Sequence, residues 1–382
     1  MRAVAIALVV LGHVLLMMRL CFRPLTGWAI MAGYFGVEIF FVLSGFLIGG
    51  ILIRDFRAGG ASAGTLSRFW CRRWLRTLPL YYLFVAINLA INVSLGTPNT
   101  NWGWNIAFLQ NFTTPAGPFF TEAWSLAVEE WFYLLAPVLI FALVKTGLPL
   151  KRAVLYAAVG GIVCATAWRM HVVATGHPDW LRGARSVVTM RLDACMFGVF
   201  ASWWKQYAPA SWNAWSKGKF VTGLLCLLGA GAMFRLLPLN VSFAARTHLF
   251  TLTSAGAMLC LPALAAIQVS RGKMTLGVTC LSKWSYAMYL VNFPIFMWLA
   301  RHVAYGLLHP VTAGATAAAG LALSILASAV LHYCYESPIL RWRDRHVTAT
   351  RHVTGEAEAA GSSESPLPAE KADGLLPAAK AL

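Results

Sequence analysis

The stretch MRAVAIALVVLGHVLLMMRL, residues 1–20, is an apolar run with Arg2 near its start and His13 in its middle. In a helix these two side chains lie roughly 16 Å apart along the axis and about 20° apart in rotation, so they share one face. Ionisable groups inside a membrane span are costly and usually face the protein interior, where they serve function. The run predicts a first transmembrane helix with Arg2 and His13 as candidate site residues. The plainer interpretation is a positively charged flank and a polar group packed between helices.

The composition predicts an integral membrane protein. Hydrophobic residues make up 59% of the chain and charged residues 12%, whereas a soluble domain is about 25% charged. The formal net charge of +17 could indicate a nucleic-acid partner, but the basic residues lie in short clusters between apolar runs. This pattern favours the positive-inside rule, so we expect no nucleic-acid binding. The eight cysteines are scattered without a CxxC pair, and we expect neither a metal site nor a disulfide framework.

Apolar stretches long enough to cross a bilayer predict an all-α membrane protein with about ten transmembrane helices in a polytopic bundle. The candidate spans lie near residues 3–20, 31–53, 75–95, 126–144, 151–173, 187–204, 220–237, 249–268, 281–303 and 311–335. They form one membrane domain over residues 1–345. The tail 346–382 is rich in Ala, Glu, Ser, Pro and Gly, a composition that predicts a disordered segment.

The distribution of lysine and arginine predicts the orientation of the bundle. With ten spans, 22 of these residues fall on the side that holds both termini and 9 on the opposite side. The positive-inside rule therefore places both termini, and the tail, in the cytoplasm.

The segment SRFWCRRWLRTLPLYY enters the third predicted span from the cytoplasm. Its four arginines, Arg68, Arg72, Arg73 and Arg76, recur at spacings that put most of them on one helix face. Such a face suits a polyanionic ligand such as the phosphates of a coenzyme. Anchoring on anionic lipid is the alternative. Arg76 lies deepest and is the preferred functional member.

Three carboxylates lie inside the second and fourth spans. Glu38 is in GVEIFFVLSGFLI, where either a helix-holding pair with an arginine or a catalytic role would account for it. Glu129 and Glu130 lie in WSLAVEEWFYLLAP; because adjacent residues point about 100° apart, we expect one of them to face the bundle interior. The preceding loop, 96–123, is long enough to fold over a site.

Further polar residues lie in the later spans. Arg191 and Asp193 predict a structural ion pair, and Glu336 predicts a pair with an arginine. Tyr289 and Asn292 share one helix face.

Taken together, these pieces resemble acyltransferase family 3, the ten-helix membrane O-acyltransferases. The matching pieces are Arg2 and His13 as an R-x10-H motif, GVEIFFVLSGFLI, RRWLRTLPLYY, WSLAVEEWFYLLAP, SYAMYLVNFPI and YESPILR. Each piece is weak alone, but their order and spacing make the joint match strong. The resemblance implies a bacterial inner-membrane enzyme. It would transfer an acyl group, commonly acetyl from acetyl-CoA, to a sugar hydroxyl of a surface polysaccharide, a lipid-linked glycan or a glycosylated small molecule.

The resemblance also implies roles for individual residues. His13 and Arg2 match the motif needed for activity, Arg73 and Arg76 the arginines at the cytoplasmic edge, and Glu130 the acidic position of the fourth span. The chain departs from the family at three points. The usual Asp-Gly-Leu before the motif's arginine is missing, so we expect that the start of the chain was wrongly assigned or is truncated. Glu38 replaces the commoner Asp, and Asn292 replaces a frequent His, so no acid–base role is assigned to Asn292.

A mechanism fits this layout. Acyl-CoA binds from the cytoplasm as a co-substrate rather than a resident cofactor, with Arg73 and Arg76 on its phosphates and Arg2 as a further candidate. His13 serves as general base on the acceptor hydroxyl or as acyl relay, and Glu130 orients the imidazole or binds the acceptor. The sequence leaves direct transfer and an acyl-enzyme both open. Two alternatives are a transporter with His13 and the intramembrane glutamates as a proton relay, and a family member that binds without catalysis.

Overall fold

The chain consists of helices and loops, without a strand, over the residues that the computed structural model describes, which are 1–347 except 20, 95, 97–101, 268–271 and 304–308. In chain order these helices are α1 Arg2–Met18, α2 Leu25–Gly59, α3 Ala63–Ser94, α4 Trp102–Ile106, α5 Ala123–Lys145, α6 Leu150–Gly176, the π-helical turn η1 Trp180–Ala184, the short 3₁₀ turn η2 Val188–Met190, α7 Leu192–Tyr207, α8 Pro209–Asn213, α9 Ser216–Leu236, α10 Phe243–Arg246, α11 His248–Ala265, α12 Lys273–His302, α13 Pro310–Leu331, the π-helical turn η4 His332–Glu336 and α14 Ser337–His346.

Each of the ten predicted spans overlaps a helix, but the count of ten is not confirmed. Seven helices of the described chain are long and apolar enough to cross a membrane; they begin at Leu25, Ala63, Ala123, Leu150, Ser216, His248 and Pro310. Helices α1 and α7 have 17 and 16 residues, fewer than the ~20 that a bilayer requires. The predicted disordered tail, 346–382, lies outside the described residues from 348 onward; of its two described residues, His346 ends α14 and Val347 follows the helix.

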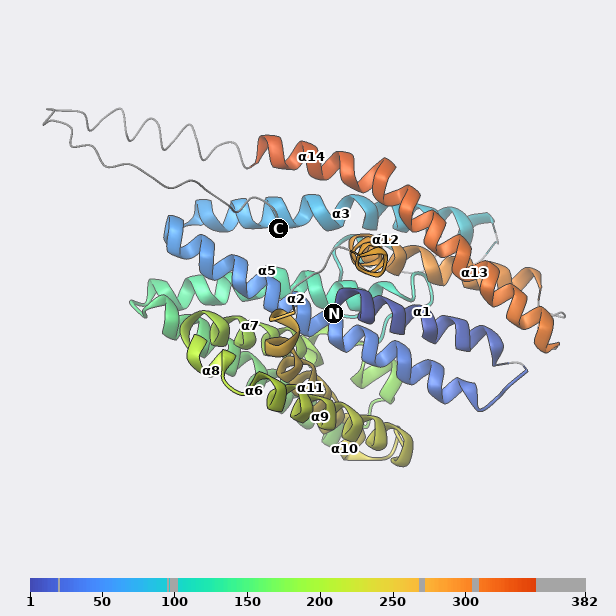
Figure 1. Cartoon of the computed structure of the whole chain (residues 1–382), viewed down its shortest axis with the longest axis horizontal. Coiled ribbons are helices and arrows are strands. Elements are labelled where there is room, and N and C mark those ends of the chain that lie inside the picture. The colour runs from blue at the N-terminus through green and yellow to red at the C-terminus, as the bar shows by residue number, and fades with distance from the viewer. Residues whose placement is uncertain (20, 95, 97–101, 268–271, 304–308, 348–382) are drawn as a thin grey trace, which may run out of the picture.

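Helix α1 lies between α2 and α12, and α2 in turn packs on α7. Figure 1 shows α1, α2 and α12 near the middle of the bundle, with α3 and α14 toward one side and α9 and α10 toward the other. Apolar side chains fill these contacts, among them Ile6 of α1, Phe41 of α2 and Leu290 of α12, all fully buried. The helix that carries Arg2 and His13 is therefore enclosed by neighbours on the face where both residues lie.

Small residues let α2 and α7 approach closely. A Cβ atom added to Gly45 would lie 1.8 Å from the carbonyl oxygen of Cys195, and one added to Gly198 would lie 2.0 Å from the carbonyl oxygen of Val42. Neither position tolerates a side chain without moving a backbone. Close packing through small residues is a common way of joining membrane helices.

Two buried ion pairs fasten the beginning of α7 to its neighbours. The Arg191 Nη2 atom lies 2.5 Å and 2.6 Å from the two carboxylate oxygens of Glu38 on α2. The Arg169 Nη1 atom on α6 lies 2.8 Å from Asp193 Oδ2. The predicted pair of Arg191 with Asp193 is therefore wrong, because each residue has an opposite charge on a different helix. Glu38 forms the helix-holding pair that was one of its two interpretations.

The prediction that Glu336 pairs with an arginine is also wrong. Its Oε2 atom lies 2.8 Å from Nδ1 of His332, four residues earlier in the π-helical turn η4. A partner within the same turn needs no neighbouring helix, and the sequence spacing alone does not distinguish it from an arginine across the bundle.

We predict that Gly45→Ala destabilises the protein, because the added methyl group would force α2 and α7 apart. Overpacking of this kind costs about 1–3 kcal/mol. Melting of the purified protein in detergent measures the effect. Gly33→Ala on the same helix is the matched control, since a Cβ there meets nothing within 4 Å. Equal melting temperatures for the two variants would contradict the prediction.

Candidate active site

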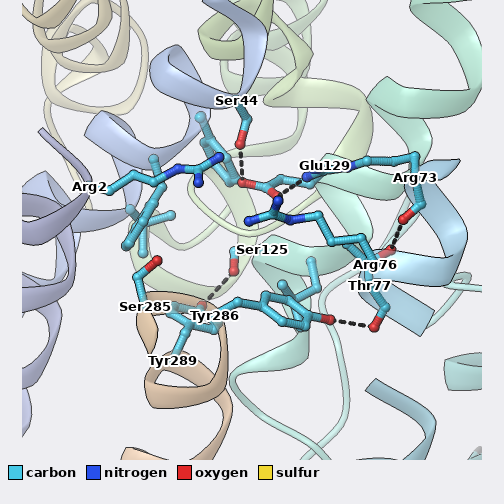
Figure 2. Close-up of a pocket in the computed structure, with 14 residues that line it drawn as sticks. Arg2, Ser44, Arg73, Arg76, Thr77, Ser125, Glu129, Ser285, Tyr286 and Tyr289 are labelled. Atoms are coloured by element: carbon cyan, nitrogen blue, oxygen red, sulfur yellow. Dashed lines mark hydrogen bonds and ion pairs between the residues drawn. The ribbon is translucent and has the colours of Figure 1, made fainter. Parts of the chain in front are cut away.

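An arginine-lined pocket lies where α1, α2, α3, α5 and α12 meet, and has a volume of about 70 Å³. Figure 2 shows Arg2 reaching into it from one side and Arg73 and Arg76 from the other. Among the described residues, Arg2 and Arg76 have no hydrogen-bond or ion-pair partner. Of the four arginines of α3, most of which were expected on one helix face, Arg72 pairs instead with Asp55 of α2. Arg2, Arg73 and Arg76 thus converge on one pocket.

Glu129 lines this pocket and organises its polar wall. Its carboxylate accepts hydrogen bonds from Ser44 Oγ at 2.9 Å and from the Tyr133 hydroxyl at 2.6 Å. The Arg73 guanidinium lies over the Tyr133 ring, 4.0 Å from its centroid, and donates to the same hydroxyl. Arg73 is 3.9 Å from the Glu129 carboxylate, so its charge is partly compensated and its direction is fixed.

Glu130, the acidic residue to which the resemblance gave a role, lines neither this pocket nor the cavity around His13. Its side chain is buried, and its Oε2 atom has no hydrogen-bond partner among the described residues. The helix geometry predicted that one of the two adjacent glutamates faces the bundle interior, but it did not tell which of them lines a pocket. In the structure it is Glu129 that contacts the pocket.

His13 lies in a second, larger cavity of about 780 Å³. Its walls come from α1, α2 and α12, from residues 116–122 of the loop before α5, and from residues 181–186 around η1. The loop 96–123 was predicted to be long enough to fold over a site, and its residues 116–122 do line this cavity. Cavities of 300–1,000 Å³ are typical of small-molecule sites, so this one has room for a sugar unit.

The hydrogen bond between His13 and Asn292 assigns the imidazole tautomer. Asn292 Nδ2 donates to the backbone carbonyl oxygens of Met288 and Tyr289, the latter at 3.0 Å. Its Oδ1 atom therefore faces His13 Nδ1 and accepts the hydrogen that Nδ1 carries. Nε2 keeps its lone pair and is free to take a proton. Asn292 is a contact of His13 that sequence reasoning missed. It shares one helix face with Tyr289 and stands where the family often has His, but neither feature indicated this contact.

Val37 and Tyr289 separate the two spaces, since both residues line the arginine pocket and the His13 cavity. The Tyr289 hydroxyl donates to the backbone carbonyl oxygen of Glu122 at 3.1 Å and contacts Ser125 Oγ at 2.5 Å. These bonds hold the ring between α12 and the start of α5.

Glu122 lines the His13 cavity just before α5 begins. Its Oε1 atom is buried without a hydrogen-bond partner in the described structure. Burial raises the pKa of this carboxyl group to about 8, since the charged form loses its solvation. At neutral pH the group is mostly protonated and can donate a hydrogen bond into the cavity.

The raised pKa of Glu122 predicts a pH-dependent stability. The folded protein holds this proton up to about pH 8, whereas the unfolded chain releases it near pH 4.3. The stabilisation of the folded state by this proton is therefore fully present below about pH 4.3 and is lost as pH rises through 8. We expect Glu122→Gln to melt at a higher temperature than the wild type at pH 8.5, with a smaller difference at pH 5. A difference independent of pH would show that Glu122 titrates normally.

Comparisons with known proteins agree with this architecture. The acyltransferase family 3 model, described as an acyltransferase domain, matches residues 1–333. Acyltransferase MdmB of Streptomyces mycarofaciens is 27% identical over 357 residues, covering 85% of this chain and 86% of that relative. Peptidoglycan O-acetyltransferase OatA of Listeria monocytogenes is 30% identical over 136 residues, covering 31% of this chain and 21% of that relative. No solved structure matches the chain.

The apolar helices and the enclosed polar pockets define a membrane protein with an internal site. The chain belongs to acyltransferase family 3, whose model covers most of its length. The resemblance noted in the sequence is thereby confirmed, and with it the class of enzyme, an acyltransferase. Membership does not support the transporter alternative. The chain spans about a fifth of OatA but most of MdmB.

Proposed function

We propose that the protein transfers an acetyl group from acetyl-CoA to a sugar hydroxyl of a surface polysaccharide, a lipid-linked glycan or a glycosylated small molecule. The observation that supports this proposal is the back-to-back arrangement of the two spaces. One presents two arginines, Arg2 and Arg76, without ion-pair partners among the described residues, and the other presents an imidazole with a free nitrogen. Of the described lining residues, only Val37 and Tyr289 line both spaces.

The arginine pocket is the proposed donor site. Arg2 and Arg76 offer unpaired guanidinium groups, which bind phosphate strongly, while Glu129 and Tyr133 hold Arg73 in place. The pocket's volume of about 70 Å³ is below that of typical ligand sites. The pocket therefore holds only part of CoA: its phosphates bind to the arginines, and its pantetheine arm extends toward Tyr289. Displacement of Tyr289 then lets the thioester reach His13.

His13 is the proposed general base. Nε2 takes the proton from the acceptor hydroxyl as its oxygen attacks the thioester carbonyl carbon. The new C–O ester bond forms, the C–S bond breaks, and the departing CoA thiolate receives the proton from the imidazolium. Asn292 holds the imidazole through Nδ1, the position at which an orienting partner belongs. Glu130 has no role in this mechanism.

We further infer that the protein lies in the bacterial inner membrane with both termini in the cytoplasm. The distribution of 22 cationic residues against 9 supports this orientation. It would place the arginine pocket on the side where CoA is made and the His13 cavity toward the outside, where surface glycans are exposed.

We predict that His13→Ala lowers kcat for acyl transfer by about 10²–10⁴-fold, since it removes the base. Asn292→Leu, which leaves the imidazole without its partner, should lower kcat less. The measurement is mass analysis of surface glycans and secreted glycosides from cells that lack the gene and are complemented with each variant. His171→Ala is the control, because His171 lies exposed on α6 and lines neither space.

An acyl mass that disappears on deletion, returns with the wild type and His171→Ala, and stays absent with His13→Ala would identify the acceptor and support the role of His13. Full restoration by His13→Ala would show that another group is the base. If deletion changed no acyl mass, O-acylation itself would be the wrong function.

We predict that Arg76→Gln raises KM for acetyl-CoA about 10-fold or more, because a hydrogen bond to a charged group contributes about 1.5–3 kcal/mol. KM is measured from CoA release by the purified protein with the acceptor found in the preceding experiment. Lys151→Gln is the control, since it removes one positive charge from an exposed position outside the pocket. An unchanged KM in Arg76→Gln would exclude this arginine from the donor site.

A further inference from the structure

The wall of the His13 cavity that contains Arg185 is rigidly anchored. Trp180, at the start of η1, is buried among aromatic side chains, and its indole donates to the carbonyl oxygen of Ala245 at 3.0 Å. Its backbone N–H donates to Asn240 Oδ1 at 2.8 Å, and its carbonyl oxygen accepts from the backbone N–H of Arg185 at 3.0 Å. On the far side, Asn111 donates to the carbonyl oxygen of Ser186 at 2.6 Å. Arg185 is thus held between two fixed points.

The guanidinium of Arg185 has no anionic partner. It lies over the Trp124 ring, with Cζ 4.9 Å from the ring centroid, and its Nε atom is buried without a hydrogen bond. Within the described chain it forms no ion pair. The fully buried arginines Arg169 and Arg191 each have a carboxylate. A cation held in this way costs free energy unless a ligand supplies the missing charge.

The cavity around Arg185 is electropositive. Arg19 and Arg182 also line it, and Glu122 has the only carboxyl group among the described residues of its wall. Burial raises the pKa of Glu122 to about 8, so this group compensates little of the positive charge at neutral pH. Arg2 and Arg76, which also have no ion-pair partner among the described residues, line the proposed donor site. By the same reasoning Arg185 marks a second anion site on the opposite side of Tyr289.

We propose that the acceptor carries a carboxylate or a phosphate, and that Arg185 binds this anion while a sugar hydroxyl of the same molecule faces His13. The inference rests on the proposed function, because it assigns the His13 cavity to the acceptor. The planar guanidinium, fixed on Trp124, matches the two oxygens of either anion. A uronic acid residue and a phosphate-linked sugar are the two sources of this chemistry.

The test is binding of three probes to the full-length protein in lipid nanodiscs by calorimetry at matched ionic strength. The probes are methyl β-D-glucuronide, glucose 1-phosphate and methyl β-D-glucoside. We expect at least one anionic probe to bind about 10-fold more tightly than the neutral one, and Arg185→Gln to abolish this preference. Arg185→Lys should retain part of it. Arg301→Gln is the control, since Arg301 is exposed on α12 and does not line the cavity.

The anionic probe that binds better tells whether the site is for carboxylate or for phosphate. Equal binding of neutral and anionic probes, binding of none, or an unchanged preference in Arg185→Gln would each overturn the proposal. So would a variant that loses acyl transfer yet binds the anion normally, because Arg185 would then act on the reacting carbonyl group. Anion binding without acyl transfer in the wild type would overturn the proposed function alone.

Discussion

The buried ion pair between Glu38 and Arg191 is the interaction on which the site depends. A carboxylate and a guanidinium in a membrane interior are tolerable only together, since an uncompensated buried charge costs about 3–5 kcal/mol. The pair fixes α2 against the start of α7, and α2 supplies Val37 and Ser44 to the wall of the arginine pocket. The close contacts at Gly45 and Gly198 also hold α2 against α7, and they involve no charge. Displacing α2 would deform both pockets at once.

Much of the fold follows from the sequence, because hydrophobic runs of bilayer length have few alternatives to a helix. The side-chain pairs between different helices cannot be read from the sequence in the same way. Arg191 and Asp193 are close in the sequence, yet each pairs with a different helix, as only the packing of α2 and α6 on α7 reveals. The sequence argument also did not give the number of membrane crossings: α1 and α7 are short, and α12, though 30 residues long, is not among the seven helices that are long and apolar enough to cross a membrane.

Part of the candidate site follows from the sequence as well. Arg2 was singled out by the cost of placing charge in an apolar run, and Arg73 and Arg76 by their helical spacing and by the family resemblance; all three converge on one pocket. Uncharged residues and residues outside the predicted spans gave no signal of this kind. Asn292 reaches His13 across 279 positions, and Arg185 enters its cavity through a turn whose direction depends on the anchoring of Trp180. The choice of Glu129 over Glu130 depends on how far α5 is rotated about its axis.

The barrier formed by Val37 and Tyr289 has an electrical consequence. With the two spaces open to opposite faces of the membrane, as proposed, the acyl group would move outward as the hydroxyl proton of the acceptor moves inward to CoA. Formally, the acyl group leaves sulfur as a cation and carries one positive charge outward, while the proton carries one positive charge inward. The complete reaction therefore moves no net charge across the bilayer. Its equilibrium would then be set by thioester and ester chemistry rather than by the membrane potential, which contributes about 2.3 kcal/mol per charge at 100 mV. A closed tyrosine between the spaces, held by Glu122 and Ser125, would also keep ions from following the same route.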